Sequence, residues 1–220
     1  MKLIFIIFTL KKIPILSWSS SDTFNLTPKF ITLVYLILGL VLFGLGETLL
    51  ITANIGVSPW NVLAQGISFK TEYNIGITVF FVSIGVLCFW IPLKQKPGIG
   101  TILNAIIISL VIYSTISYLP SPKLFFNQIL QTLIGIAIVG LGSGFYLIAN
   151  LGPGPRDGLI TGLQNTTHLS LALIRAIVEI SAVLVGWYMG GIVGIGTILF
   201  AFGVGPSVSA GLFFVGRYIK

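Results

Sequence analysis

The segment LGETLLITANIGVSP at residues 45–59 recurs 96 residues later as LGSGFYLIANLGPGP at residues 141–155. The same offset aligns GIGTIL at 98–103 with GIGTIL at 194–199, and 20 of the 67 positions from Gly39 to Ala105 match their counterparts. Identity at one fixed offset over this length indicates an internal duplication. We therefore predict two homologous repeats, at residues 31–119 and 124–220.

The composition places both repeats in a membrane. Of the 220 residues, 55% are hydrophobic and 8% are charged, and the mean hydropathy is +1.06. Soluble domains carry about 25% charged residues, so this chain has too little polar surface to cover a globule in water. A soluble enzyme and a nucleic-acid partner are thereby excluded, and the lipid bilayer is the expected surrounding. The single Cys88 and single His168 exclude a disulfide framework and a Cys/His metal cluster, so we expect no metal and no cofactor.

Apolar stretches of about 20 residues, the length that crosses a bilayer as a helix, occur six times. They lie at residues 31–53, 74–93, 98–119, 126–149, 170–190 and 194–216. We expect an all-α integral membrane protein with six transmembrane helices, three in each repeat. Because three is odd, the second repeat must enter the membrane from the opposite side, so the repeats are expected to be inverted. Many secondary transporters use this arrangement for alternating access.

The distribution of Lys and Arg predicts the orientation. Nine of these residues fall in the terminal segments and the loops on the same side, against two, Lys70 and Lys123, on the other side. Because cytoplasmic loops are enriched in Lys and Arg, both termini of this multi-pass protein are expected in the cytoplasm. Residues 1–30 contain no stretch long enough to span, and we expect them to form a cytoplasmic N-terminal arm that touches the lipid surface.

Each repeat contains a predicted helix break of the form N-x-G-x-x-P. Asn and Gly can adopt the left-handed conformation that ends a helix, and Pro is suited to the first turn of the next one. The residues concerned are Asn54, Gly56 and Pro59 in the first repeat and Asn150, Gly152 and Pro155 in the second.

The segments after these breaks, residues 59–69 and 155–166, are too short to span, since helices of this length reach only about 17 Å. They either lie flat at the membrane interface or enter it as re-entrant half-helices, and the sequence leaves both open. Half-helices that enter from opposite faces would bring two N-termini together near the midplane, where their dipoles attract anionic groups.

Four charged residues of the second repeat are candidates for a substrate path. Arg156 and Asp157 open the second short segment, where the cation can hold a carboxylate or phosphate; alternatively, Asp157 caps the helix and Arg156 follows the cytoplasmic bias. Arg175 and Glu179 lie four residues apart in the fifth span, an ion-pair spacing. Charged residues inside a transmembrane span usually mark a substrate or ion pathway, and the alternative here is a purely structural ion pair.

Glu47, three asparagines and a glutamine complete the candidate residues. Glu47, in the first span, is either a proton-carrying acid or an interfacial residue in contact with water. Asn54, Asn61 and Asn150 can line a polar cavity, together with Gln65. For Asn54 and Asn150, however, helix termination is a sufficient explanation.

The block GxG…ANLGxGPRDGL from Gly142 to Leu159, followed by Arg175, Glu179 and GIGT from Gly194, resembles the YczE/YyaS/YitT family of bacterial inner-membrane proteins. The similarity covers residues 31–216. It implies a polytopic protein of the cytoplasmic membrane, and it brings no substrate with it.

These features lead us to expect a small-solute transporter or permease-like protein with a small anionic solute as its partner. The alternative is a non-transporting membrane partner or scaffold of a biosynthetic or signalling complex. An enzyme is not expected, because the sequence has no nucleophile–base pair or metal cluster. The oligomeric state is left open.

Overall fold

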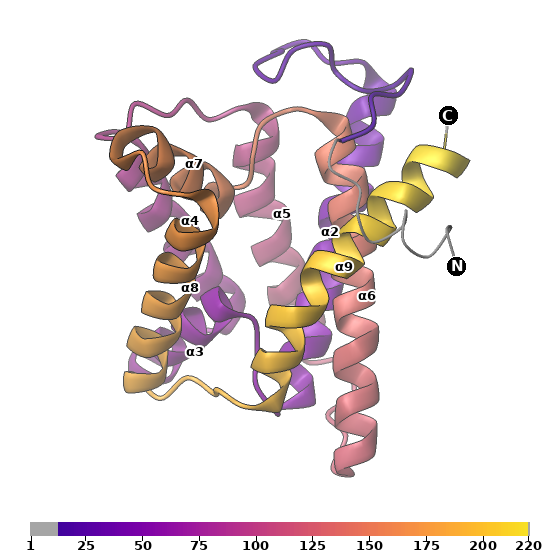
Figure 1. Ribbon diagram of the computed structural model, residues 1–220. Helices are drawn as coiled ribbons and strands as arrows, with labels where there is room; N and C mark the ends of the chain where they lie inside the picture. The colour runs from indigo at the N-terminus through magenta and orange to yellow at the C-terminus, as the bar shows by residue number, and fades with distance from the viewer. Residues whose placement is uncertain (1–12, 220) are drawn as a thin grey trace.

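The computed structural model describes residues 13–219, and within this range every regular element is a helix (Figure 1). This confirms the predicted all-α class. The helices are α2 Phe30–Ala53, α3 Pro59–Thr71, α4 Ile75–Trp90, α5 Ile99–Thr115, α6 Phe125–Ala149, α7 Pro155–Thr167, α8 Leu171–Tyr188 and α9 Ile195–Tyr218.

Four of these helices, α2, α6, α8 and α9, are long and apolar enough to cross a membrane. A fifth candidate is the pair α3 and α4, which are bent by 118° relative to each other. The six predicted spans overlap α2, α4, α5, α6, α8 and α9, but the structure of residues 13–219 supports four spans, or five if the bent pair counts as one, instead of six. The shortfall arises because α4 is long enough only together with α3, and α5 has only 17 residues, or about 26 Å of helix. The chain is thus a multi-pass protein whose apolar helices are embedded in a lipid bilayer.

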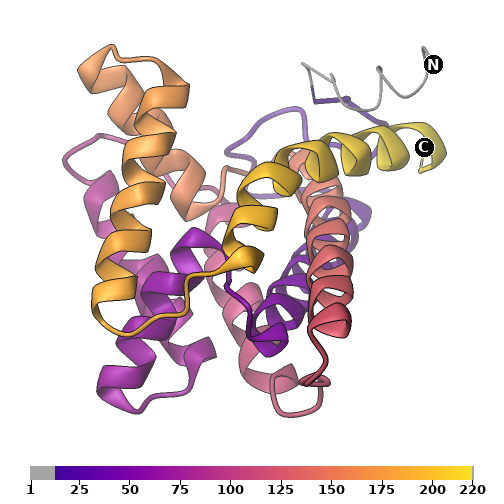
Figure 2. The same cartoon turned by 60° about the horizontal axis from the view of Figure 1, so that its bottom comes forward.

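The centre of the fold is the pair α2 and α6, which lie side by side and run antiparallel (Figures 1 and 2). A Cβ atom on Gly39 would lie 2.7 Å from the Gly142 carbonyl oxygen, and a Cβ atom on Gly46 would lie 2.7 Å from the Gly135 carbonyl oxygen. Small residues at such points let two helix backbones approach closely. The two contacts are related by the sequence offset, because 39 + 96 = 135 and 46 + 96 = 142.

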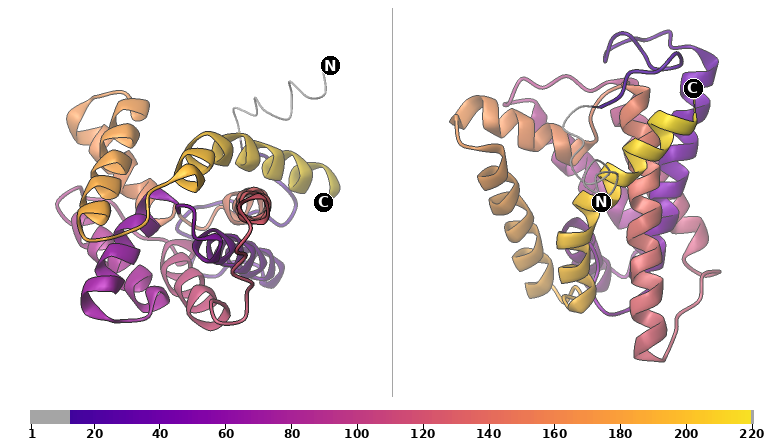
Figure 3. Two further views of the ribbon diagram at one scale, coloured as in Figure 1. Left: turned by 90° about the horizontal axis from the view of Figure 1, so that it is seen from below. Right: turned by 45° about the vertical axis from the view of Figure 1, so that its right-hand side comes forward.

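Around this pair, each half of the chain reaches into the other. Helix α3 of the first half packs on α8 of the second, and α7 of the second half packs on α4 of the first. Helices α5 and α9 lie against α2 and α6, respectively (Figure 3). The two halves therefore share one interior.

The turns between α2 and α3 and between α6 and α7, which we call the elbows, have matching backbone conformations. Asn54 and Asn150 have φ angles of 58° and 53°, and Gly56 and Gly152 have φ angles of 112° and 115°. These left-handed conformations end α2 and α6, while Pro59 and Pro155 begin α3 and α7. The chain reverses at both places over a few residues.

Each elbow is hydrogen-bonded to the start of a helix in the other half. The Gly196 amide at the start of α9 donates to the Ile55 carbonyl at 2.8 Å, and the Gly100 amide at the start of α5 donates to the Leu151 carbonyl at 2.7 Å. These bonds are again related by the offset, because 100 + 96 = 196 and 55 + 96 = 151. The GIGT segments at 98 and 194 are therefore where the elbows dock.

The segment before α2 packs over the second elbow. Trp18 is 3% exposed, and its ring N–H donates to the Ile219 carbonyl at 3.3 Å. The Ser20 amide donates to the Ala149 carbonyl at 3.1 Å, and Asn150 Nδ2 donates to the Ser20 carbonyl at 2.9 Å. The described part of the predicted arm thus packs on protein, its contact with lipid stays a prediction, and residues 1–12 lie outside the described range.

Substituting Gly152 by Ala tests whether the elbow conformation supports the fold. Gly152 has a φ of +115°, and an added Cβ would lie 2.7 Å from Thr101 Oγ1 and 3.0 Å from Gly98 Cα. We expect Gly152→Ala to lower the free energy of unfolding by about 1–3 kcal/mol, measured as a lower Tm of the purified protein in detergent. Gly85→Ala in α4 is the control, because nothing lies within 4 Å of an added Cβ there. Equal Tm values for the two variants would contradict the expectation.

Candidate functional site

The first turns of the two short helices meet through their second residues. Trp60 in α3 is 8% exposed, and the guanidinium carbon of Arg156 in α7 lies 5.6 Å from the centroid of a Trp60 ring. A cation at this distance from an indole is attracted by the ring's negative face. The two residues occupy matching places in the halves, because 60 + 96 = 156. The side chains at the starts of α3 and α7 therefore reach each other.

Arg156 is a half-buried cation without an ion-pair partner. In residues 13–219, the salt bridges within 4.0 Å involve Arg175 and not Arg156. The negative charges that act on Arg156 from farther away belong to Glu47, Asp157 and Glu179. The first backbone N–H groups of a helix also lack partners within the helix. Arg156 and the first backbone N–H groups of α7 are the groups that attract an anion here, and Asp157 in the same first turn is the negative charge already present.

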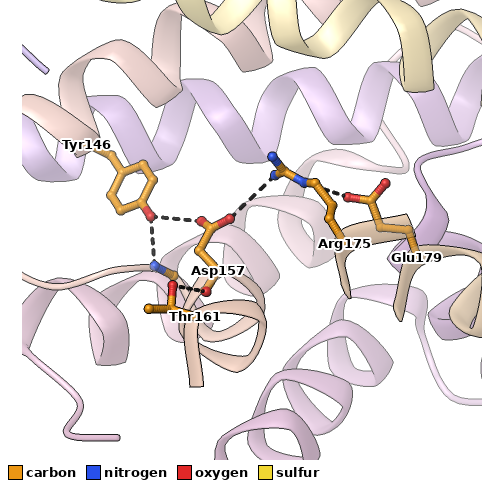
Figure 4. Close-up of polar contacts among 6 residues, drawn as sticks. Tyr146, Asp157, Thr161, Arg175 and Glu179 are labelled. Carbon is orange, nitrogen blue, oxygen red and sulfur yellow. Dashed lines mark hydrogen bonds and ion pairs between the residues drawn. The ribbon is translucent and has the colours of Figure 1, made fainter. Parts of the chain in front are cut away.

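Asp157, Arg175 and Glu179 form a connected group beside Arg156 (Figure 4). Arg175 Nη2 lies 3.6 Å from Asp157 Oδ1, and Arg175 Nε donates to Glu179 Oε1 at 3.1 Å. Tyr146 extends the group from α6: its hydroxyl donates to Asp157 Oδ2 at 3.2 Å and accepts the Gly154 amide at 2.7 Å. The sequence-predicted residues Asp157, Arg175 and Glu179 are thus in contact with one another. Arg156 is next to Asp157 in the chain, but its side chain contacts Trp60 instead.

This group is accessible. The side chains of Arg175 and Asp157 are 55% and 49% exposed. In the first half α4 packs on α5, but the corresponding helices α8 and α9 of the second half diverge and have no comparable packing (Figure 3). The charged group therefore lies on an open side of the fold, on helices that pack on α3 and α4.

Glu47 lies in a separate, buried environment on α2. It is 1% exposed, and its Oε2 accepts hydrogen bonds from Ser58 Oγ at 2.9 Å and from Asn61 Nδ2 at 2.8 Å. The first elbow reverses the chain so that these two residues return to the level of Glu47. No Lys or Arg of the described chain comes within ion-pair distance of its carboxylate.

The two elbow asparagines lie apart from the charged group. Asn54 is exposed at the rim of a cavity of about 530 Å³ that is also lined by Lys123 and Gln128. Asn150 is half-buried beneath the N-terminal segment, where Thr23 Oγ1 donates to its Oδ1 at 3.2 Å. The two elbows thus differ: Asn54 of the first elbow is exposed, whereas Asn150 of the second elbow is covered by the N-terminal segment.

The sequence did not single out Ser58 or Tyr146, although one signal was present. In both halves the elbow turns the chain back so that two side chains 11 positions apart form a hydrogen bond. The pairs are Glu47 with Ser58 and Tyr146 with Asp157. A helix that ends in an N-x-G-x-x-P break and reverses would produce this spacing. Within residues 13–219, no group of three or more His, Cys, Asp and Glu is placed to hold a metal ion.

Comparison with known proteins relates the whole membrane part of the chain to one family. Residues 30–211 match the profile described as "Family of unknown function (DUF6198)". An uncharacterized protein of Haemophilus influenzae is 39% identical over 205 residues, which cover 93% of this chain and 93% of that protein. No solved structure matches the chain.

Two proteins of Bacillus subtilis are also similar. The uncharacterized membrane protein YczE is 30% identical over 169 residues, covering 74% of this chain and 77% of YczE. The uncharacterized protein YyaS is 26% identical over 171 residues, covering 76% of this chain and 85% of YyaS. The chain therefore belongs to the DUF6198 family and is homologous to YczE and YyaS, as the resemblance in its sequence predicted.

Proposed function

We propose that this protein is a small-solute transporter or permease-like protein of the bacterial cytoplasmic membrane that carries a small anionic solute. The observation that carries the proposal is the half-buried Arg156, which has no carboxylate within ion-pair distance in the described chain and extends from the start of α7 to Trp60 at the start of α3. A carboxylate or a phosphate fits this environment, because both accept hydrogen bonds from a guanidinium and from helix N-terminal amides.

The architecture proposed for this function is a pair of inverted repeats, residues 31–119 and 124–220. The support is that contacts between the halves occur in reciprocal pairs. Gly39 contacts Gly142, and their counterparts Gly135 and Gly46 contact each other. Each elbow also accepts a hydrogen bond from the other half. A contact that recurs with its two partners exchanged is what a two-fold axis between repeats produces. With α2 and α6 antiparallel in a bilayer, that axis would lie in the membrane plane. The excess of Lys and Arg would place both termini in the cytoplasm.

The short helices α3 and α7 are proposed to be re-entrant. In α3, Trp60 and Asn61 near the start are buried, whereas Phe69 and Lys70 near the end are exposed. In α7, Gly158 is buried and Thr167 is exposed. A helix lying flat at an interface buries one face along its whole length. Burial that decreases from the N-terminus to the C-terminus instead supports half-helices that begin inside the protein.

The difference between the halves supports alternating access. In the first half α4 packs on α5, whereas in the second half α8 and α9 diverge. The two halves therefore have different shapes although the backbone conformations of their elbows match. Inverted repeats that exchange two such shapes would expose a central site to one side and then to the other. Asp157, Arg175 and Glu179 lie on the diverged side and connect α8 to α7.

Removing the charge of Arg156 tests the anion site. We expect Arg156→Gln to lower the affinity for the transported anion by about tenfold or more, because hydrogen bonds to charged groups contribute about 1.5–3 kcal/mol. The measurement is uptake into liposomes of radiolabelled inorganic phosphate and of small carboxylates such as lactate. Arg217→Gln is the matched control, since Arg217 is exposed at the end of α9. Equal uptake by Arg156→Gln and the control would contradict an anion site at Arg156.

Neutralising Glu179 tests the charged group. We expect Glu179→Gln to stop uptake, because Arg175 would lose one of its two carboxylate partners and the connection of α8 to α7 would change. Glu72→Gln, at an exposed carboxylate after α3, is the control. Normal uptake by Glu179→Gln would remove this group from the mechanism.

One observation favours the second candidate, a non-transporting partner or scaffold. The charges of Asp157, Arg175 and Glu179 pair among themselves, which is sufficient to hold α8 on α7 without any solute. A scaffold would copurify with a fixed partner even when Arg175 and Glu179 are both neutralised, and its liposomes would show no uptake. Uptake that is lost in those variants supports the transporter instead.

A further inference from the structure

Glu47 and Asn61 leave two oxygen atoms buried without hydrogen-bond partners among the described residues. These are Glu47 Oε1 and Asn61 Oδ1. The two side chains are already joined, because Asn61 Nδ2 donates to the other carboxylate oxygen at 2.8 Å. Glu47 is 1% exposed and Asn61 is fully buried. Neither orphan oxygen can therefore be satisfied by bulk water.

One proton accounts for both orphan oxygens. A carboxylate only accepts hydrogen bonds, but a protonated carboxyl group has an O–H that donates. With the proton on Oε1, Glu47 gains a donor, and Asn61 Oδ1 is an unused acceptor on the side chain it already contacts. An O–H that turned to Oδ1 would give acid and amide two reciprocal hydrogen bonds, N–H to Oε2 and O–H to Oδ1. Turning the amide over does not help, because it would bring an oxygen instead of a nitrogen to Oε2.

Burial argues in the same direction. An ionised carboxylate in a protein interior is costly unless a cation pairs with it, and Glu47 has no such partner within 4.0 Å in the described chain. We propose that Glu47, with Asn61 and Ser58, is a proton-binding site: in the structure Glu47 holds a proton on Oε1, and it exchanges this proton with water. The balance is simple, since a hydronium ion gives one proton to the carboxylate and leaves as water.

The charges around Glu47 explain why the proton is exchangeable. Helices α5 and α6, which pack on α2, contain no charged residue. In α3 the charged residue is Lys70, which lies in the exposed last turn. Arg156 of α7 is the cation whose field acts on Glu47. Arg156 and the N-terminus of α3 both stabilise the carboxylate, so the acid is not locked in its protonated form.

The second half of the described chain has no buried acid–amide pair of this kind, so the proposed proton-binding site belongs to the first half. The counterparts of Glu47 and Asn61 are Ser143 and Asp157, because 47 + 96 = 143 and 61 + 96 = 157. Asp157 is half exposed and pairs with Arg175, whereas Glu47 is buried and pairs with an amide. The buried acid–amide pair is therefore a feature of the first half, and the second half has an exposed ion pair in its place.

Infrared spectroscopy of the purified protein in lipid nanodiscs tests the protonation directly. At neutral pH we expect a carbonyl band of a protonated carboxylic acid that shifts when all Glu residues are labelled with ¹³C, and this measurement requires no substitution. The band should be absent in Glu47→Gln and present in Glu179→Gln and Glu72→Gln. Asn61→Ala should move the band, since the acid loses its amide partner. A Tm of Glu47→Gln equal to that of the unsubstituted protein would show that the variant is folded, because the Gln amide can pair with Asn61.

Two results would overturn the proposal. One is the absence of a ¹³C-Glu-sensitive carboxylic acid band at neutral pH. The other is a band that remains unchanged in Glu47→Gln, which would assign the proton to Glu72 or Glu179.

If the proposed transport also holds, the proton and the anion are coupled. A deprotonated Glu47 would compete with the anion for Arg156, so an anion at Arg156 favours the protonated acid, and by linkage the proton favours the anion. This step rests on the proposed function, and its test is separate: uptake should depend on an imposed pH gradient in the unsubstituted protein and not in Glu47→Gln. A Glu47 band without any uptake would retain the proton site and reject the transporter. Uptake that does not depend on the pH gradient in either protein would reject the coupling of proton and anion but leave the proton site and the transporter in place.

Discussion

A chain that bends inside an apolar environment must pair the backbone groups that the bend leaves free, because each unsatisfied group in lipid costs several kcal/mol. Here the two elbows meet this requirement through each other's halves. The Ile55 carbonyl is bonded by the Gly196 amide, and the Leu151 carbonyl is bonded by the Gly100 amide. Each of these elbow carbonyls is bonded by the other half, so the two halves are linked at both elbows.

The position of the elbows determines where the chemistry lies. Each elbow returns the chain into the interior, and the Trp60 side chain at the start of α3 contacts the Arg156 side chain at the start of α7. The same return places Ser58 and Asn61 beside Glu47, and Asp157 beside Tyr146. A duplicated backbone thus carries two different sets of side chains. One set is a buried acid with an amide, and the other is an exposed ion pair next to an unpaired cation.

The sequence predicts the features that depend on local conformation. The duplication, the helical class and the places where the chain turns are visible in it, because Asn, Gly and Pro act through their own backbone preferences. The lengths of the membrane-spanning helices were harder to predict from the sequence. Helices α4 and α5 end at Trp90 and Thr115, several residues before the apolar stretches do, and hydropathy alone does not register these ends.

Contacts between distant segments could not be predicted. Arg175 and Glu179 were paired correctly by their spacing, but Asp157 joins them through the packing of α7 on α8. Likewise, the partners of Glu47 depend on the direction in which the elbow turns, and the placement of Trp18 depends on the shape of the surface made by α2, α6 and α9.

The central claim, that the two halves are inverted, is tested most directly by labelling single cysteines from either side of the membrane. Glu72 and His168 are matching residues, because 72 + 96 = 168, and both are exposed left-handed residues that end α3 and α7. In a Cys88→Ser background, we expect a membrane-impermeant thiol reagent to label Glu72→Cys from the outside and His168→Cys only from the cytoplasmic side. Labelling of both positions from the same side would contradict the inverted arrangement.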